Sequence, residues 1–344
     1  MNRVKIIAEI GPNHNGSIKL AKRIIKQISK LDIDYIKFQF SNPSQVYSKD
    51  SFKASYQKKN DGKRTIIEMS KKNQLTLSEH LELSKYCSFF KKEYCCSFFD
   101  LHSITKMDKK INLPFYKIPS GEICSIDILK FISKKNKKIL LSTGMADIKI
   151  IKNSVNLLKK KNIILLHCVS SYPTNPNNVN LNFIDTLKKK FNLKIGFSDH
   201  TKGYLPALGA IAKGAEYIEK HVTLNNNLKG PDHKASLNIN AFKKYVSQIR
   251  KFEKILGKKQ KKMLINEIDV KKMSRKSVVS KKLIRKGQII KYEDICFKRP
   301  GTGFNPLYAK FIINKKVKNN ILKDKVIKPN DLVLKNSLYK KFLN

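Results

Sequence analysis

The stretch KIIAEIGPNHNGSIKLAKRIIKQISKL, residues 5–31, predicts one buried strand followed by one amphipathic helix. Its first part, KIIAEI at 5–10, is short and apolar, as expected of a strand that is covered on both faces. The second part begins at Ser17, a residue type that favours the N-cap position of a helix. Four apolar residues then recur on one helical face, Ile18, Ala21, Ile25 and Ile28.

Strand-like runs of the same kind recur along the chain, mostly alternating with helical stretches. They lie at 35–40, 94–99, 115–119, 138–143, 163–168, 193–198 and 217–222. Eight strands alternating with helices over about 250 residues match the number and size expected of a (β/α)8 TIM barrel. The connection at 41–76 is long and rich in Lys, Ser and Asn, and it is predicted to be an active-site loop rather than a further domain.

The end of the chain has a different pattern. A helix is predicted at 241–256, and a very basic polar stretch follows it. Residues 274–306 then predict short strands and turns, with glycines as turn signals. We therefore predict an α/β barrel domain at 1–272 and a small, mostly β domain at 273–344.

The formal net charge is +46, from 72 Lys and Arg against 26 Asp and Glu. Such a charge suits nucleic-acid or anionic-membrane binding. Lysine is spread along the whole chain, however, without the basic stripe and interleaved aromatic residues of an RNA-binding surface. A solvated basic surface is therefore the favoured interpretation, and nucleic-acid binding beyond non-specific charge attraction is not expected. Such a surface would still steer anionic substrates.

No apolar run approaches the roughly 18 residues that a membrane helix needs. The N-terminus leads directly into a strand, without the apolar region of a signal peptide. These features predict a soluble cytoplasmic protein without a membrane partner. The six cysteines have no framework spacing and are predicted to be reduced residues of the core, namely Cys87, Cys95, Cys96, Cys124, Cys168 and Cys296.

Barrel enzymes place their chemistry at the C-terminal ends of the strands, and polar residues gather at these positions here. Lys37 and Gln39 are two apart in one strand and hence share a face. Lys37 and Lys117 lie inside apolar strands, where a lysine is seldom buried without an anionic partner. With hydroxyls from Ser97, Ser120 and Ser142 nearby, the two lysines predict a cradle for phosphate and carboxylate.

A second polar group is predicted from IEKHVTL at 218–224 and GFSDHT at 196–201. Glu219 and His221 are two apart and share a face, and His200 follows the neighbouring strand. Two imidazoles suit a borderline divalent ion such as Mn²⁺ or Zn²⁺. Glu219 and Asp232 remain for proton transfer or for orienting ligands, whereas Lys220 is predicted to face away into the charged surface.

Taken together and in order, these motifs resemble the sialic acid synthase family, which includes N-acetylneuraminate, legionaminate and pseudaminate synthases. The tail SRKSVV…FKRPGTGFNP resembles the SAF (antifreeze-like) domain of that family. The motifs that carry the resemblance are EIGPNHNG, IKFQ, YKIPSGE, LSTGM, HCVSSYPT, GFSDHT, IEKHVTL and GPDHKASL.

The resemblance implies condensation of phosphoenolpyruvate with an N-acyl hexosamine, such as N-acetylmannosamine or a 2,4-diamino-6-deoxy relative. The products would be a nine-carbon 2-keto-3-deoxy acid and phosphate. By the family pattern, His200 and His221 bind a divalent metal, Mn²⁺ or Mg²⁺, and Glu219 and Asp232 lie near the sugar. The other residues so implied at the substrates are Lys37, Lys117, Asn13, Gln39, Ser97, Phe99, Ser120, Ser142, Tyr172 and Ser198.

The SAF resemblance implies a domain-swapped homodimer in which Arg299 reaches the pocket of the partner subunit. Two positions depart from the family pattern. Asn15 stands where some members carry glutamate, and Ser170 stands where asparagine is familiar. GPDHKASL is closer to members that make legionaminate-type acids. Two alternatives stay open: a phosphoenolpyruvate–aldose synthase that uses arabinose 5-phosphate or erythrose 4-phosphate, and a basic nucleic-acid-binding protein.

Overall fold

A computed structural model of the chain describes residues 3–159, 162–334 and 342. Contacts within the chain divide it into two compact units, residues 1–257 and 258–344, which are described separately. The predicted domain boundary near residue 272 stays a prediction. Within the described residues, no helix has the length and apolar character needed to cross a membrane.

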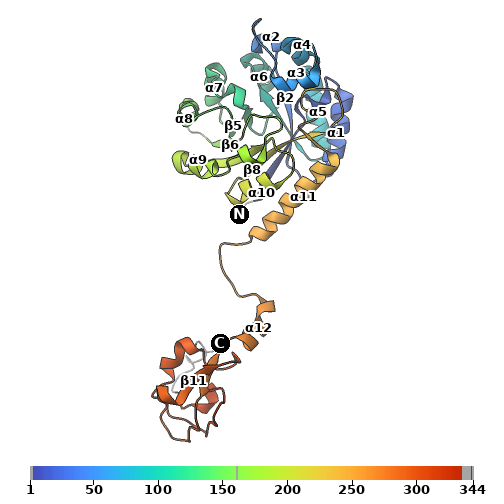
Figure 1. Ribbon diagram of the computed structural model, residues 1–344. Helices are drawn as coiled ribbons and strands as arrows, with labels where there is room; N and C mark the ends of the chain where they lie inside the picture. The colour runs from blue at the N-terminus through green and yellow to red at the C-terminus, as the bar shows by residue number, and fades with distance from the viewer. Residues whose placement is uncertain (1–2, 160–161, 335–341, 343–344) are drawn as a thin grey trace. The chain divides into compact units, whose positions relative to one another are not determined.

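The first unit is a closed barrel of eight parallel strands (Figure 1). Each strand pairs with the next along the chain, and β8 pairs with β1 to close the barrel. This confirms the predicted (β/α)8 fold. The strands are β1 (Lys5–Glu9), β2 (Tyr35–Phe40), β3 (Glu93–Phe98), β4 (Tyr116–Ile118), β5 (Ile139–Ser142), β6 (Ile163–His167), β7 (Lys194–Asp199) and β8 (Tyr217–Thr223).

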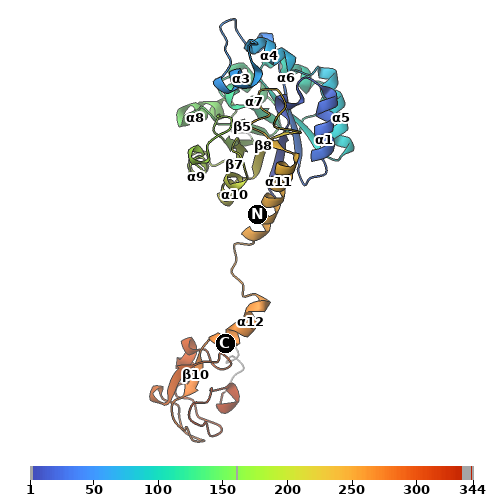
Figure 2. The same cartoon turned by 45° about the vertical axis from the view of Figure 1, so that its right-hand side comes forward.

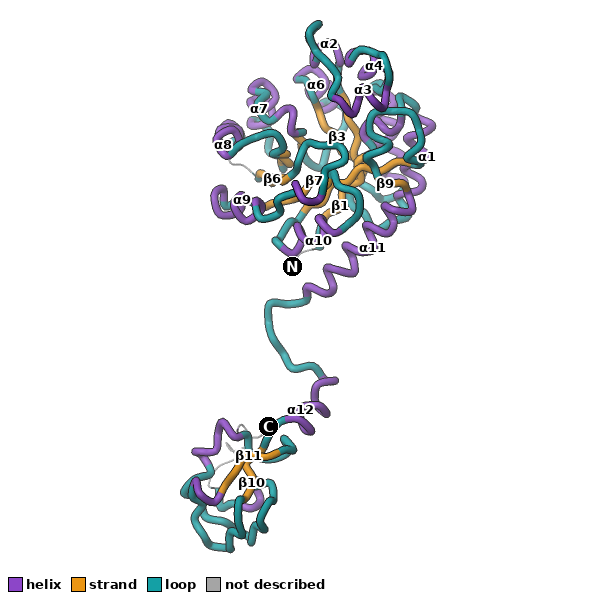
Figure 3. Tube along the Cα trace, in the orientation of Figure 1, coloured by secondary structure: helices purple, strands orange, loops and turns teal. Residues whose placement is uncertain are grey.

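Helices surround the strands on the outside, as the turned view and the tube trace show (Figures 2 and 3). The first of them begins where it was predicted, because the Ser17 hydroxyl accepts a hydrogen bond from the Leu20 amide. A short strand, β9 (Leu237–Asn238), extends beside β8. The surrounding helices are α1 (Ile18–Ile28), α5 (Leu77–Phe89), α6 (Leu101–Asp108), α7 (Ile126–Ser133), α8 (Ile148–Leu157), α9 (Phe183–Phe191), α10 (Leu205–Ala212) and α11 (Ile239–Leu256). Single 3-10 turns lie at Gly11–His14, Ser120–Glu122 and Pro176–Asn178.

The barrel has two apolar layers because successive strand residues point to opposite faces. The larger layer lies between the strands and the helices. The smaller one fills the inside of the barrel and includes an edge-to-face contact between the rings of Tyr35 and Phe115, whose centroids are 4.9 Å apart. Its members are Ile7, Tyr35, Cys95, Phe115, Leu140, Ile164, Leu166 and Tyr217. Closer to the C-terminal ends of β1, β2, β3, β4, β5, β7 and β8, the inward positions are polar.

The connection at 41–76 was predicted to be a loop, and this is wrong. It contains three short helices, α2 (Pro43–Val46), α3 (Ser55–Asp61) and α4 (Ile66–Lys72). A capping box begins α4: the Thr65 hydroxyl accepts a bond from the Glu68 amide, and the Glu68 carboxylate accepts one from the Thr65 amide. Short helices of this kind have too few turns to produce a clear hydrophobic period. Capping residues such as Thr65 and Glu68 are the sequence signal that marks the start of such a helix.

The second unit is small and mostly β, as predicted. It contains α12 (Ile268–Ser274) and the antiparallel pair β10 (Ser277–Ser280) and β11 (Ile295–Lys298). Isolated bridges such as Ile284 with Ile321 extend the pairing. Its own core includes Val278, Ile284, Ile290, Phe304, Val317 and Ile327. Single 3-10 segments lie at Ile265–Glu267, Tyr292–Asp294, Pro306–Phe311 and Pro329–Asp331.

The cysteines are free thiols, but their predicted burial is wrong for two of them. Cys124 is exposed, since it lies in the surface turn between a 3-10 segment and α7. Cys296 is half-buried, because β11 belongs to a two-stranded sheet in which only one face is covered. The four buried thiols are Cys87, Cys95, Cys96 and Cys168.

The inside of the barrel leaves no room at Gly196 of β7. A Cβ added there would lie 2.3 Å from Leu166 Cδ2 and 2.8 Å from the Tyr217 carbonyl oxygen. We expect Gly196→Ala to lower the free energy of unfolding by about 1–3 kcal/mol, the usual cost of overpacking. The matched control is Gly121→Ala, whose added Cβ meets nothing within 4 Å. Equilibrium urea unfolding measures both variants, and equal stability of the two would contradict the packing argument.

Candidate active site

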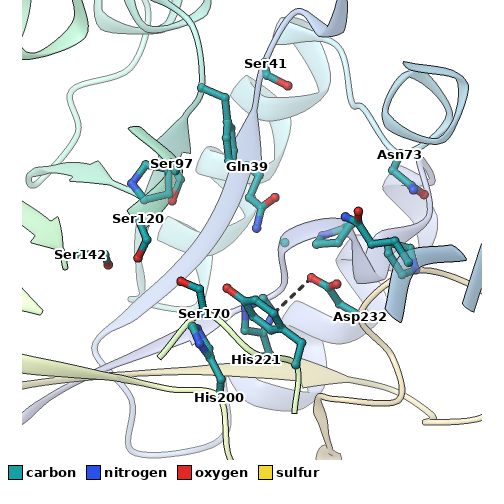
Figure 4. Close-up of a pocket in the computed structure, with 18 of the residues that line it drawn as sticks. Gln39, Ser41, Asn73, Ser97, Ser120, Ser142, Ser170, His200, His221 and Asp232 are labelled. Carbon is teal, nitrogen blue, oxygen red and sulfur yellow. Dashed lines mark ion pairs between the residues drawn. The ribbon is translucent and has the colours of Figure 1, made fainter. Parts of the chain in front are cut away.

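A cavity of about 370 Å³ opens at the C-terminal ends of the barrel strands, a volume suited to a small-molecule ligand. Its lining combines inward strand residues with side chains from the 41–76 connection (Figure 4). In the close-up, Ser120, Ser142 and Ser170 lie on one side and Asn73 on the other. The predicted residues that line it are Lys37, Gln39, Ser97, Phe99, Lys117, Ser120, Ser142, Tyr172, Ser198, His200, Glu219, His221 and Asp232.

Two predicted residues lie elsewhere. Asn13 is buried but is not part of this lining, because its amide nitrogen donates to the Val222 carbonyl and the Ser236 hydroxyl. It joins the first strand–helix turn to the end of β8, and its predicted contact with substrate stays a prediction. Arg299 belongs to the second unit and is exposed there. Its predicted contact with a partner subunit stays a prediction.

Inside the barrel, two lysines and two glutamates form one buried ionic network. Lys37 pairs with Glu9, and its ammonium lies 3.9 Å from Glu219. Lys117 lies 3.8 Å from the same Glu219 oxygen. All four side chains are at most 5% exposed. The expectation that the buried lysines have anionic partners is therefore met by carboxylates of the chain itself.

The network shifts the pKa values of its carboxyl groups in opposite directions. Burial disfavours ionisation of Glu219, but Lys117 and Lys37 outweigh that effect and lower its pKa to about 2. Burial has the largest effect on Glu9 and raises its pKa. Lys37 lowers the pKa of Glu9 and the Glu219 charge raises it, and the result is a pKa of about 7. Glu219 is thus firmly ionised, whereas Glu9 is poised to hold or release a proton near neutral pH.

Hydroxyl groups complete the network. The Lys37 ammonium donates to the Ser97 hydroxyl at 2.7 Å, and the Lys117 ammonium donates to the Ser142 hydroxyl at 2.8 Å. The Ser198 hydroxyl donates to Glu219 at 3.0 Å. Each of these bonds joins neighbouring or nearby strands, so the polar layer also fixes the relative positions of the strand ends.

The two predicted metal ligands face each other across the same cavity, with ring centroids 5.9 Å apart. His200 Nδ1 donates to the Val169 carbonyl at 2.7 Å, so its Nε2 carries the lone pair. His221 Nδ1 is buried and has no hydrogen-bond partner in the described part of the chain. Burial lowers the pKa of both imidazoles, which keeps them neutral, the form that binds metals.

The donor set fits a divalent cation. His221 Nδ1 lies 3.8 Å from an Asp232 carboxylate oxygen, and burial raises the pKa of Asp232 to about 7. Two neutral imidazoles beside a carboxylate suit ions of the Mn²⁺ to Zn²⁺ series. Nowhere in the described part of the chain do three His, Cys, Asp or Glu side chains converge as a complete metal site. His200 and His221 could supply two nitrogens to such an ion, with water and substrate as its other ligands.

Glu9 begins the EIGPNHNG motif, but sequence reasoning did not include it in the site. Its signal was the same alternation that identified Lys37, since Ile7 and Glu9 both point inward on β1. Gln39 donates to Glu9 at 2.9 Å and thereby turns toward the network.

The lining that was missed comes mainly from the 41–76 connection. The Tyr56 ring lies 5.3 Å from that of Tyr172, which in turn lies 4.3 Å from the His200 ring. No local pattern marks such residues, because only tertiary contact brings the short helices over the strand ends. The lining side chains of this connection are Ser41, Tyr47, Ala54, Tyr56, Gln57, Met69, Ser70, Asn73 and Gln74. His14, Met145 and Cys168 also line the cavity without having been assigned a role.

The two positions that depart from the family pattern differ in their surroundings. Asn15 bonds to the Lys229 carbonyl and accepts from His233, so it holds the segment before Asp232 rather than lining the cavity. Ser170 does line the cavity, and its buried hydroxyl has no hydrogen-bond partner among the residues that the structure describes. Ser170 is thus available to a ligand.

Lys220 was predicted to lie in the charged surface, and this is wrong. Its side chain is 1% exposed and pairs with Asp199 at 3.0 Å. Alternation does turn Lys220 away from the barrel axis, but on β8 the outer face is covered by α11 instead of water. A lysine there needs a buried carboxylate, and Asp199 supplies it.

Comparison with known proteins now identifies the family. Residues 24–261 match the NeuB family and residues 275–333 match the SAF domain. An N,N'-diacetyllegionaminic acid synthase of Campylobacter jejuni is 39% identical over 334 residues, which cover 95% of this chain and 100% of that protein. The chain belongs to the NeuB family.

Two further relatives show what this NeuB-family chain is similar to. An N,N'-diacetyllegionaminic acid synthase of Legionella pneumophila is 35% identical over 324 residues, covering 92% of this chain and 91% of that protein. A crystal structure of N-acetylneuraminic acid synthetase from Leptospira borgpetersenii has a TM-score of 0.70 and 32% identity, covering 78% of this chain and 90% of that one. The predicted resemblance to sialic-acid-type synthases with a SAF domain is confirmed.

The ionic network makes a specific prediction about stability. At a pH of about 8, where Glu9 with its pKa of about 7 is mainly ionised beside Lys37, Lys37→Met leaves Glu9 buried without its cation and should cost about 3–5 kcal/mol, as expected when one partner of a buried pair is removed. Adding Glu9→Gln removes the unpaired charge, so Lys37→Met/Glu9→Gln should recover part of that loss. Denaturant unfolding of the two single variants and the double variant measures the coupling. If the double variant loses as much free energy of unfolding as the two single variants lose together, the pairing of Lys37 with Glu9 is contradicted.

Proposed function

We propose that this NeuB-family chain condenses phosphoenolpyruvate with the open-chain form of an N-acyl hexosamine. A carbon–carbon bond forms between C3 of phosphoenolpyruvate and the sugar aldehyde, water adds at C2, and the C2–phosphate bond is lost. The products are a nine-carbon 2-keto-3-deoxy acid and phosphate. The observation that carries the proposal is that two buried lysines and two neutral, facing imidazoles share one cavity.

The lysine side of the cavity suits the anionic substrate. Lys37 and Lys117 would bind the phosphate and carboxylate of phosphoenolpyruvate, with hydroxyls of Ser97, Ser120 and Ser142 as further donors. With Glu9 protonated, the network carries one excess positive charge for an incoming anion. The ionised Glu219 would stabilise positive charge that develops at C2.

The histidine side suits the sugar. His200 and His221 would hold a divalent cation, Mn²⁺ or Mg²⁺, which supplies Lewis acidity toward the aldehyde oxygen. Asp232, whose pKa of about 7 allows both protonation states, would move a proton at that oxygen or at the attacking water. Tyr172 and Tyr56 would form the apolar wall along the sugar and exclude bulk water.

The relatives favour one class of sugar. The two legionaminic acid synthases are 39% and 35% identical to this chain, against 30% for the human N-acetylneuraminate-9-phosphate synthase. The proposed substrate is therefore a 2,4-diamino-6-deoxy N-acyl hexose in preference to N-acetylmannosamine. We further propose a cytoplasmic homodimer in which the exposed Arg299 of one SAF domain contacts the N-acyl group in the partner's cavity.

The metal proposal predicts that phosphate release depends on both histidines. His200→Ala and His221→Ala should each lower Mn²⁺-dependent phosphate release by at least about 100-fold, because one neutral nitrogen of two is removed. Phosphate release after chelator treatment and Mn²⁺ addition measures the effect. A Ser84→Ala variant on α5 controls for handling. Full turnover of either histidine variant, or of chelator-stripped enzyme, would sink the proposal.

The sugar proposal predicts an order of substrates. With phosphoenolpyruvate, a 2,4-diacetamido-6-deoxy hexose should give more phosphate and product than N-acetylmannosamine. Arabinose 5-phosphate and erythrose 4-phosphate should give neither. Mass spectrometry of the products identifies the acid that forms. Product from a sugar phosphate alone would favour the alternative aldose synthase.

A further inference from the structure

A second buried polar cluster lies behind the active site, on the outer face of the barrel. It is built on Asp199 of β7 and Lys220 of β8, which are direct partners in the parallel register. Each is 1% exposed. Their neighbours along the strands, Ser198, Glu219 and His221, point inward to the cavity, so the cluster and the active site use alternate residues of the same two strands.

The contacts satisfy both charges. Lys220 pairs with Asp199 Oδ2 at 3.0 Å, donates to the Thr201 carbonyl, and lies 5.2 Å from the centre of the Tyr245 ring. The Tyr245 hydroxyl donates to Asp199 Oδ2 at 2.9 Å. Asp199 Oδ1 accepts from both the amide and the hydroxyl of Thr201, at 2.9 and 2.7 Å. Because Tyr245 belongs to α11, the cluster ties two strands to a helix.

Stability alone is a poor reason for such a cluster. Burying two charges costs free energy of desolvation, and apolar replacements of similar volume are often neutral or stabilising. The helix-facing side of a barrel strand is otherwise apolar, as Ile218 and Val222 on β8 show. A role in geometry is the better explanation.

The geometry concerned is that of His200. The β7–β8 ladder ends at the pair Asp199–Lys220, so His200 lies just beyond the last strand pairing. Its own carbonyl accepts one bond, from the Thr174 amide at 2.9 Å. The residues on both sides of it, Asp199 and Thr201, are held by the outer cluster. The Val169 carbonyl holds the His200 ring, and the outer cluster holds the backbone that carries this ring toward His221.

We propose that Asp199, Lys220 and Tyr245 are positioning residues that set the separation and direction of His200 and His221 for metal binding. This rests on the proposed function, since it concerns the metal assigned there. It predicts that disturbing the outer cluster weakens metal binding although none of its three side chains lines the cavity.

The test is Mn²⁺ titration of the full-length, chelator-stripped protein, followed by the electron paramagnetic resonance signal of free Mn²⁺. Lys220→Met keeps the aliphatic stem and removes the charge. We expect a folded protein whose dissociation constant for Mn²⁺ rises about 10- to 100-fold, the usual effect of losing an outer partner of a metal ligand. The Michaelis constant for phosphoenolpyruvate at saturating Mn²⁺ should stay close to that of the wild type.

A matched control separates positioning from general loss of stability. Lys92 is a half-buried lysine at the other end of the barrel, just before β3, and donates to the Leu31 and Ile33 carbonyls at 2.9 Å each. Lys92→Met should lower the thermal unfolding midpoint without changing the Mn²⁺ constant. Equal weakening of Mn²⁺ binding in Lys92→Met and Lys220→Met would overturn the inference.

Tyr245→Phe provides a second variant, which removes a single hydroxyl and keeps the ring. If Lys220→Met does not fold, a several-fold rise in the Mn²⁺ constant of Tyr245→Phe supports the inference and an unchanged constant overturns it. If Lys220→Met binds Mn²⁺ as tightly as the wild type does, the positioning role is overturned and the metal proposal is not affected. A wild-type protein that binds no Mn²⁺, or binds it equally after His221→Ala, overturns the metal proposal and this inference with it.

Discussion

Two lysines and two glutamates that are buried together inside the barrel are the constraint on which the rest of the site depends. Each charge is costly to bury and is tolerated because the others compensate it. The four side chains come from β1, β2, β4 and β8, strands that lie far apart in the sequence. The network therefore requires a closed barrel with its strands in this register, and a shift by one residue would turn the charges into the apolar helix layer.

The same layer explains why one cavity can combine two kinds of chemistry. Lys37 and Lys117 keep their charges because carboxylates are close, which leaves cations for an anionic ligand. Burial keeps His200 and His221 neutral, although His221 lies 3.8 Å from an Asp232 oxygen. The higher ordinary pKa of lysine and the burial of the two imidazoles together decide which basic groups are charged.

Much of this could be predicted from local spacing. The pairs Lys37–Gln39 and Glu219–His221 were each assigned to one face of their strand from their separation of two residues, and the structure places all four at the cavity. The same rule turned Lys220 outward correctly, but its exposure was predicted wrongly. In a (β/α)8 barrel the outward direction leads to a helix, and the spacing of one strand carries no information on which side chain of α11 lies opposite.

The sequence by itself determines the order of strands and helices, the inward face of each strand and the family motifs, because these depend on alternation and on residue identity over short distances. The tertiary structure decides the rest. It pairs Glu9 with Lys37, brings Tyr56 over Tyr172 and buries Lys220 against Asp199. It also separates the pKa values of Glu9 and Glu219. Pairing and desolvation depend on distances between strands that are remote in sequence, and only the closed barrel defines those distances.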